Sequence, residues 1–353
     1  MKIYINAAVA ISPQPTLGTD FALQKPEKYE TEFLKCIEPD YKAYINPSLI
    51  RRMGRVVKMG VAAALQCLKE AGVEKPDAII TGTGLGCIED TESFLNEIIK
   101  NREQFLPPTS FIQSTHNTIA GQIALLLKCN SYNYAYVHRC FSFENALLDA
   151  MMMAYEQQGA KILLGGVDEI TQVSYAIMKR LGIYKSVMGS DTGIFADRTD
   201  GGIAGEGASF FVVSANPENA YAAIDGVKTF YKPADPGQTV SVVADFIRQQ
   251  GLSVHEIDAV VMGYSGDKAS DIVYDALSAS IFANNNILYY KHLCGDYFTS
   301  TAFATWASAN ILKNNYCPEA MKLRSVDTDP YRNILVYNHF DNAEHTMILL
   351  SSC

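Results

Sequence analysis

The alternation of short apolar runs with longer segments of helical period constrains this chain more than any other feature. Apolar runs of strand length recur along the whole sequence, and segments with a helical spacing of apolar residues lie between them. This pattern is typical of α/β proteins, in which helices cover sheets of mostly parallel strands. We therefore predict an α/β fold built around buried sheets.

The alternation is clearest in the first half of the chain. Expected strands cover residues 3–11, 78–83, 134–138 and 162–165, and expected helices cover residues 49–71, 90–99, 117–128 and 143–158. The second half has expected strands at 209–213, 259–262, 287–290, 334–337 and 346–350, with helices at 270–281 and 300–312. Prolines and glycines between Lys232 and Gln238 mark a candidate boundary between the halves.

Composition narrows the class of protein. A chain of 353 residues with 48% hydrophobic residues can bury a large core. Its net charge of −9 argues against nucleic acid as the main partner, because phosphate binding depends on clustered lysine and arginine. The eight cysteines form no CxxC pair, which favours a reducing compartment. We find no leader peptide and no apolar stretch of the roughly 20 residues that a spanning helix needs, so we expect a cytoplasmic protein without a membrane span.

Cys140 lies where an expected strand gives way to an expected helix. Backbone N–H groups in the first turn of a helix are unpaired and the helix dipole is positive there, so a thiolate is stabilised and its pKa falls. Such a cysteine can accept an acyl group without a dedicated base. The alternative is that Cys140 is only a small buried residue.

The glycine-rich segment from Thr81 to Gly86 follows a strand but has the spacing GxGxG. A dinucleotide site needs GxGxxG, so we interpret this segment as a tight structural turn. The six histidines show no metal-ligand spacing beyond a loose pair at His339 and His345. We therefore expect neither a cofactor nor a metal.

Several motifs, in order along the chain, resemble those of the β-ketoacyl synthase family of the thiolase superfamily. They are the basic segment 51–55, the glycine-rich segment 81–86, the AGQI segment 120–123, the GGVDE segment 165–169 and the segment 197–208 that ends in GEGA. The resemblance implies a thiolase-like fold of two pseudo-symmetric βαβαβαββ halves in a five-layer αβαβα arrangement. The halves would be residues 1–215, with the nucleophile, and a shortened 216–353. Residues 133–137 would pair across a dimer.

The resemblance places Cys140 at the nucleophile position, but the two histidines of the family are missing. Gly263, with Tyr264 beside it, aligns with the first histidine, and Asp296 aligns with the second. Lys291 and Phe340 are retained as site residues. His292 or His345 could supply a displaced hydrogen-bond donor, or each could simply be packed.

We therefore expect a divergent β-ketoacyl-ACP synthase-like protein of fatty-acid or polyketide-type biosynthesis. In this interpretation Cys140 accepts an acyl group from acyl carrier protein, and condensation is weak because the histidine donors are lost. The alternative is a non-condensing partner subunit, similar to a chain-length factor, that pairs with an active ketosynthase. A family member without acyl chemistry is a third possibility.

A basic cluster on an otherwise acidic chain is the candidate docking site for the acidic carrier protein. It consists of Arg51, Arg52, Arg55 and Lys58. Opposite charge would attract the carrier to this surface, although a solvated helix face with ordinary ion pairs would give the same pattern. By the same resemblance, His116 would lie near the acyl pocket of the dimer partner.

Overall fold

The computed structural model describes residues 1–353 except 19–20, 22, 24–25, 28–30, 186–197 and 327–329. The strands are β1 (Ile3–Ile11), β2 (Ala78–Gly82), β3 (Tyr132–Tyr136), β4 (Ile162–Asp168), β5 (Gly207–Ser214), β6 (Ala222–Tyr231), β7 (Ala259–Met262), β8 (Asn286–Tyr289), β9 (Lys322–Arg324), β10 (Asn333–Phe340) and β11 (Glu344–Ser351).

The α-helices are α1 (Pro47–Ile50), α2 (Arg55–Glu70), α3 (Ile88–Lys100), α4 (Pro108–Gln113), α5 (Thr118–Leu127), α6 (Ser142–Glu156), α7 (Gln172–Arg180), α8 (Pro236–Gln249), α9 (Ile272–Ala279), α10 (Lys291–Cys294) and α11 (Ser300–Asn314). Short 3-10 helices occur at η1 (Tyr41–Ala43), η2 (Arg139–Phe141), η3 (Val254–Glu256) and η4 (Glu319–Met321).

The strand order shows that the second half repeats the first. The order is β3-β2-β4-β5-β1 in the first half, and it continues as β6-β11-β10-β7-β8 with β9 added at the far edge. Read from the outer edge inward, β8-β7-β10-β11-β6 matches β3-β2-β4-β5-β1 strand for strand. The start of β1 joins the two strand groups into one sheet, through the pairing of Ile3 with Ile224 and of Ile5 with Ala222.

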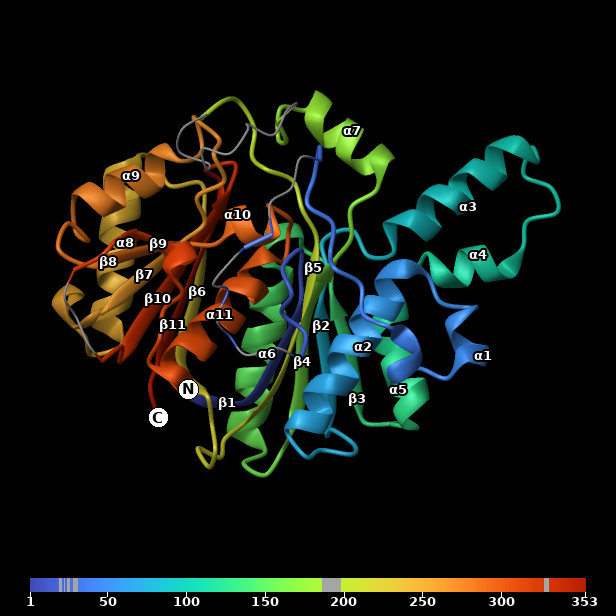
Figure 1. Ribbon diagram of the computed structural model, residues 1–353, viewed down its shortest axis with the longest axis horizontal. Helices are drawn as coiled ribbons and strands as arrows, with labels where there is room; N and C mark the ends of the chain where they lie inside the picture. The colour runs from blue at the N-terminus through green and yellow to red at the C-terminus, as the bar shows by residue number, and fades with distance from the viewer. Residues whose placement is uncertain (19–20, 22, 24–25, 28–30, 186–197, 327–329) are drawn as a thin grey trace.

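Helices and strand groups form five layers, which lie side by side in Figure 1. Helices α2 and α5 pack on the outer face of the first strand group, and α8 and α9 pack on the outer face of the second. Helices α6 and α11 share the core between the two groups. Every residue of α11 from Ser300 to Leu312 is buried, because a helix between two sheets has no solvent face. The predicted thiolase-like αβαβα arrangement of two similar halves is confirmed.

The structure corrects two expected elements. The expected helix 49–71 is split into α1 and α2, and Gly54 caps α2 in close contact with Asp90. The cluster Lys232–Gln238 begins α8, since Asp235 accepts a hydrogen bond from the Gln238 N–H and Pro236 occupies the first turn. The division at residues 215 and 216, which falls between β5 and β6, stays a prediction. Within the described ranges, no helix is long and apolar enough to cross a bilayer.

Candidate functional site

Cys140 lies in η2, between the edge strand β3 and the central helix α6. The preceding residue, Arg139, has a left-handed backbone with φ of 47°, which turns the chain sharply from strand to helix. Ser142 fixes this turn, because its hydroxyl donates to the Arg139 carbonyl at 2.7 Å and accepts from the His138 N–H at 2.8 Å. A Cβ on Gly82 would lie 2.5 Å from the Ser142 carbonyl, so a glycine is needed where β2 meets the start of α6. The turn thus holds the thiol at the first turn of a buried helix.

Cys140 is buried, and the charged groups that act on it are mainly acidic. The residue is 4% exposed. Burial raises the pKa of the Cys140 thiol well above its ordinary value, the carboxylates of Asp296 and Glu344 raise it further, and the Lys291 ammonium opposes them. Our expectation of a lowered pKa from the helix dipole is wrong for this site, because burial and nearby anions outweigh the dipole. The thiol form therefore predominates at neutral pH.

Lys291 and Asp296 form a buried ion pair, with Nζ and Oδ1 2.8 Å apart. Backbone contacts fix the position of Asp296, since its N–H donates to the Ile203 carbonyl at 2.6 Å and its carbonyl accepts from the Gly205 N–H at 3.2 Å. The segment that ends in GEGA thus lies against α10. The carboxylate at the second histidine position is neutralised by the retained lysine.

A cavity of about 290 Å³ adjoins this ion pair. Its wall includes Lys291 and Asp296, together with Phe340 and His339 from the end of β10. Phe340 packs against Phe298, with ring centroids 5.3 Å apart. The structure thus brings Lys291, Asp296 and Phe340 to one cavity, and the first two are also the charged groups that act on the Cys140 thiol.

The two histidines that the sequence offered as displaced donors lie elsewhere. His292 is stacked on Tyr289 at 3.9 Å, and burial lowers its pKa to about 3. His345 is buried between β10 and β11, stacked on Phe230 at 4.6 Å, with its Nδ1 2.8 Å from the Tyr337 hydroxyl. Neither residue is part of the cavity wall described above.

Gly263 also lines the cavity, at the position of the first missing histidine. A Cβ on Gly263 would lie 2.1 Å from Asn338 Oδ1 and 2.7 Å from the Tyr274 hydroxyl. These two side chains hydrogen-bond to each other at 3.2 Å. They occupy the space that a larger residue at 263 would require.

Asp168 organises the glycine-rich turn. One oxygen of its buried carboxylate accepts from the Gly84 N–H at 2.7 Å and from the Thr83 hydroxyl at 3.0 Å. The other accepts from the Thr299 hydroxyl at 2.8 Å and from its N–H at 3.0 Å. The turn is therefore structural, as its spacing predicted, and it ties β2 and β4 to the start of α11.

The predicted docking cluster divides into two kinds of cation. Arg55 is bound to Glu206, with NH1–Oε2 and NH2–Oε1 distances of 2.7 and 2.5 Å, and also donates to Glu38. Glu206 is fully buried and accepts from the Cys36 and Ile170 N–H groups. Arg55 therefore has a structural role in this chain.

The remaining cations of the cluster are more available. Arg51 and Arg52 are exposed in the turn between α1 and α2. Lys58 lies over the Tyr41 ring at 5.7 Å. His116 is exposed before α5, against Gly86, and is not in the cavity wall described above.

Sequence reasoning missed two residues that belong to this region. His339 lines the cavity, and Glu144 lies one turn after Cys140 with its Oε1 accepting from the Thr301 hydroxyl at 2.6 Å. Burial raises the pKa of Glu144 to about 7. A carboxylate four residues after the nucleophile, within an apolar helix, was the signal available for Glu144.

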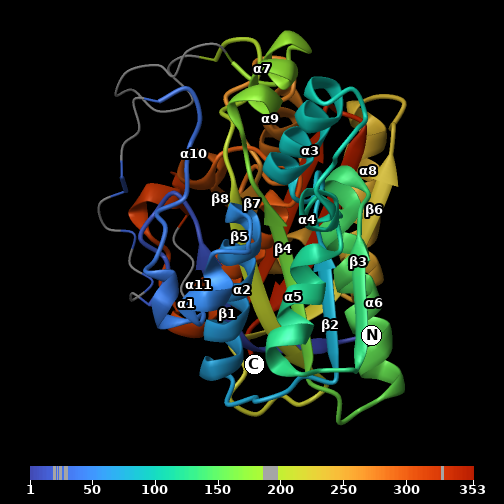
Figure 2. The same cartoon turned by 90° about the vertical axis from the view of Figure 1, so that its right-hand side faces the viewer.

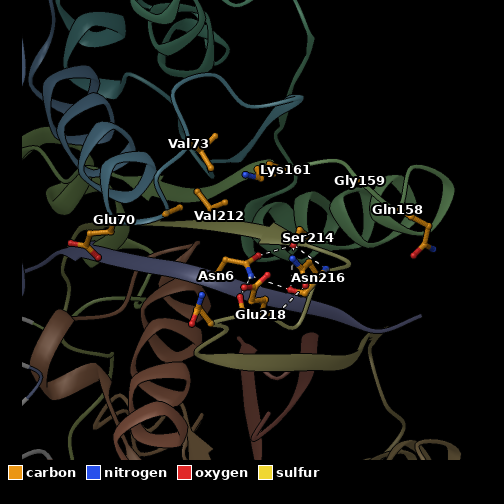
Figure 3. Close-up of a pocket in the computed structure, with 12 residues that line it drawn as sticks. Asn6, Glu70, Val73, Gln158, Gly159, Lys161, Val212, Ser214, Asn216 and Glu218 are labelled. Carbon is orange, nitrogen blue, oxygen red and sulfur yellow. Dashed lines mark hydrogen bonds between the residues drawn. The ribbon is translucent and has the colours of Figure 1, made fainter.

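A second cavity of about 530 Å³ lies away from Cys140 (Figure 3). Its wall includes Asn6, Ser214, Asn216 and Lys161, and the first three are joined by hydrogen bonds. Its polar groups bond mainly to one another, and its wall contains no cysteine or histidine. The candidate site is therefore the cavity lined by Lys291 and Asp296, whose charges act on the Cys140 thiol.

Comparison with known proteins agrees with this geometry. Residues 30–183 match the family described as "Beta-ketoacyl synthase, N-terminal domain". Residues 30–183 therefore form a β-ketoacyl synthase N-terminal domain. The matched region includes Cys140 and the turn that carries it. No curated protein matches this chain.

Solved structures share the whole fold at low sequence identity. A β-ketoacyl synthase from Burkholderia phymatum STM815 has a TM-score of 0.79 at 16% identity, and the ishigamide ketosynthase/chain length factor has 0.77 at 17%. A type II PKS acyl-carrier protein in complex with its ketosynthase has 0.78 at 12%. In each case the match covers 100% of this chain and 99% of the other. The ketosynthase fold is thus complete here, although the histidine positions are changed.

Proposed function

We propose that Cys140 accepts an acyl group from the thioester of an acyl carrier protein, and that the isolated chain condenses poorly. The observation that carries this proposal is the position of Cys140 in η2, at the start of α6, where the charges of Lys291 and Asp296 from the cavity wall act on its thiol. The backbone turn before α6 is built around this cysteine. A role in fatty-acid or polyketide-type biosynthesis follows from the family.

The charges around the thiol support acyl acceptance over decarboxylative condensation. An extender unit of the malonyl type brings a carboxylate and then develops an enolate oxygen. Asp296, Glu344 and Glu144 are carboxyl groups that act on Cys140, and Lys291 is already paired. A neutral acyl chain meets no such repulsion. The site therefore favours the first half-reaction of a ketosynthase.

The expected partners are an acyl carrier protein and a second ketosynthase-type chain. Exposed Arg51 and Arg52 offer positive charge to an acidic carrier. The outer edge of β3 ends the sheet, with exposed Tyr132 and Tyr134 beside it (Figure 2). A partner strand, from a second copy or a related chain, would cover this edge. All eight cysteines are free thiols, which supports a cytoplasmic location.

The second candidate function is that of a partner subunit, similar to a chain-length factor. The Lys291–Asp296 pair and the filled space beside Gly263 favour it, because both remove donors that condensation needs. The retained Cys140 favours the acyl-accepting function. Co-expression with a ketosynthase that has both histidines would distinguish the two functions. A partner subunit should raise the activity of that ketosynthase, and its Cys140→Ala variant should do so as well.

Intact mass spectrometry tests the main proposal. The full chain is incubated with acyl carrier protein loaded with a hexanoyl or octanoyl group, beside Cys140→Ala and Cys36→Ala. We expect an acyl adduct on the wild type and on Cys36→Ala, and none on Cys140→Ala. No adduct on the wild type, or an adduct that persists in Cys140→Ala, would contradict the proposal.

A further inference from the structure

The Cys140 thiol needs a group that takes its proton when it accepts an acyl group. Burial, Asp296 and Glu344 keep its pKa well above the ordinary value, so the thiol form predominates at neutral pH. The charged groups that act on this thiol are Asp296, Glu344, Lys291 and Glu144. Lys291 is an ammonium, and Asp296 is already paired with it at 2.8 Å. Glu144 and Glu344 therefore remain as candidate bases.

Glu144 lies one helical turn after Cys140 in an unbroken helical stretch, since η2 leads directly into α6. Side chains four residues apart in a helix are neighbours, with Cβ atoms about 5–6 Å apart, and they lean toward the helix N-terminus. Glu144 therefore leans toward the residue that carries the thiol. Glu144 is 1% exposed, and its charge contributes to the raised pKa of the buried Cys140 thiol. The two groups thus interact away from bulk water.

Neighbouring donors hold the Glu144 carboxylate and leave one oxygen free. Oε1 accepts from the Thr301 hydroxyl of α11 at 2.6 Å, and the Thr346 side chain of β11 and the Glu144 backbone N–H also favour the charged form. Among the described residues, Oε2 is buried and has no hydrogen-bond partner. A buried oxygen with unused lone pairs calls for an explanation. A proton that arrives from the thiol would satisfy it.

The proton affinity of Glu144 suits this exchange. Burial raises the pKa of Glu144 to about 7, and the charge of Glu344 adds to this rise. A general base works best when its pKa is near the working pH, because it is then both partly ionised and a strong acceptor. Glu344 lies on β11 and is only half-buried, so it serves as the comparison for a test.

We propose that Glu144 is the general base of the acyl transfer, and that its carboxylate takes the proton of the Cys140 thiol as the sulfur attacks the thioester. This inference rests on the proposed function. In the step, the Cys140 sulfur forms a bond to the thioester carbon while its proton moves to Glu144. The intermediate then breaks its bond to the carrier sulfur, which takes the proton from Glu144 and leaves as a thiol. Both sulfurs are bound to one carbon in the intermediate, so one carboxyl group serves both transfers, and atoms and charge balance.

The test measures single-turnover acylation by hexanoyl-carrier protein as a function of pH. We expect the wild-type rate at saturating carrier to rise through about pH 7 and then level off, because Glu144 must be ionised. Glu144→Gln keeps an acceptor for Thr301 but cannot take a proton. Its rate at pH 8 should therefore fall by about 10²-fold, and the inflection near pH 7 should disappear.

Glu344→Gln is the matched control, because it removes a carboxylate that raises the pKa of the same thiol. It should be acylated at least as fast as wild type, with its inflection at lower pH, because Glu344 also raises the pKa of Glu144. The two substitutions therefore change the rate in opposite directions. Iodoacetamide reacts with the thiolate, so at pH 9 it should alkylate Cys140 in both variants at least as fast as in wild type.

Each outcome bears on the proposal. Unchanged or faster acylation of Glu144→Gln would show that Glu144 is only a repelling charge, which overturns the inference and leaves the proposed function intact. An inflection near pH 7 that persists in Glu144→Gln would overturn it as well. An equal loss of acylation and alkylation in that variant would assign Glu144 to packing, with the same consequence. No acylation of the wild type would overturn the proposed function together with this inference.

Discussion

The ammonium of Lys291 lies 2.8 Å from the carboxylate of Asp296, with the lysine 2% exposed. In the family resemblance, Lys291 aligns with a retained lysine and Asp296 aligns with a histidine. Where the family has a neutral hydrogen-bond donor, this chain therefore has one half of an ion pair. A buried pair of this kind loses most of its ability to stabilise new charge, because each partner already satisfies the other. Burial and the charges of Asp296 and Glu344 raise the pKa of the Cys140 thiol, and the charge of Lys291 opposes them.

Substitution of Asp296 by asparagine should make Cys140 more reactive. Asp296 is the largest charged contribution to the raised pKa of the thiol, so its removal lowers that pKa. We expect iodoacetamide to modify wild-type Cys140 slowly at pH 7, with a rate that still rises at pH 9. At the same pH, Cys140 in Asp296→Asn should react about 3- to 10-fold faster. Peptide mapping over this pH range gives both rates. A wild-type plateau below pH 8 would show that the thiol ionises easily and that this account is wrong.

Arg55 and Arg51 should respond differently to the same substitution. Arg55→Met leaves the buried Glu206 without its cation, and breaking a buried pair costs about 3–5 kcal/mol of the free energy of unfolding. Arg51→Met removes an exposed charge and should change stability by less than about 0.5 kcal/mol. Urea unfolding measures both. Binding of acyl carrier protein should weaken in Arg51→Met, and equal stability of the two variants would refute the structural role of Arg55.

Glu144 should make the folded chain less stable as the pH rises. Burial raises its pKa from an ordinary 4.5 to about 7, so between these values the folded state binds more protons than the unfolded state. The stability contributed by this group therefore falls from about pH 4.5 to pH 7 and levels off above it, by at most about 3 kcal/mol. Glu144→Gln keeps an acceptor for Thr301 and should be more stable than wild type at pH 8 but not at pH 4.5. Parallel pH profiles for the two proteins would contradict the shift.

The outer edge of β3 should be the dimer interface. Tyr134 is 50% exposed beside this edge, and Tyr134→Asp would place a charge where a partner strand pairs. We expect sedimentation velocity to show a dimer for the wild type and mainly monomer for this variant. Tyr231→Asp, at a tyrosine that is 61% exposed on β6, is the matched control and should stay dimeric. A wild type that is monomeric alone but dimeric with a ketosynthase would assign the edge to a heterodimer.

Sequence patterns predicted the fold better than the site. The strands at 3–11 and 259–262 are correct to the residue, because each is a buried, mainly apolar run. β6 was missed because Asp225 and Gly226 interrupt its apolar pattern, and α8 because its valines favour strands. His339 was missed for a different reason. Its place in the cavity wall depends on the contacts that it makes with Tyr274 of α9, and no local spacing encodes those contacts.

The filled space beside Gly263 also limits how this chain could be re-engineered. A histidine at this position would collide with Asn338 and Tyr274, which are bonded to each other and are buried. A single substitution of Gly263 by histidine therefore cannot be accommodated unless both neighbours also move. An attempt to engineer a histidine donor at this point of the cavity would have to change all three positions together.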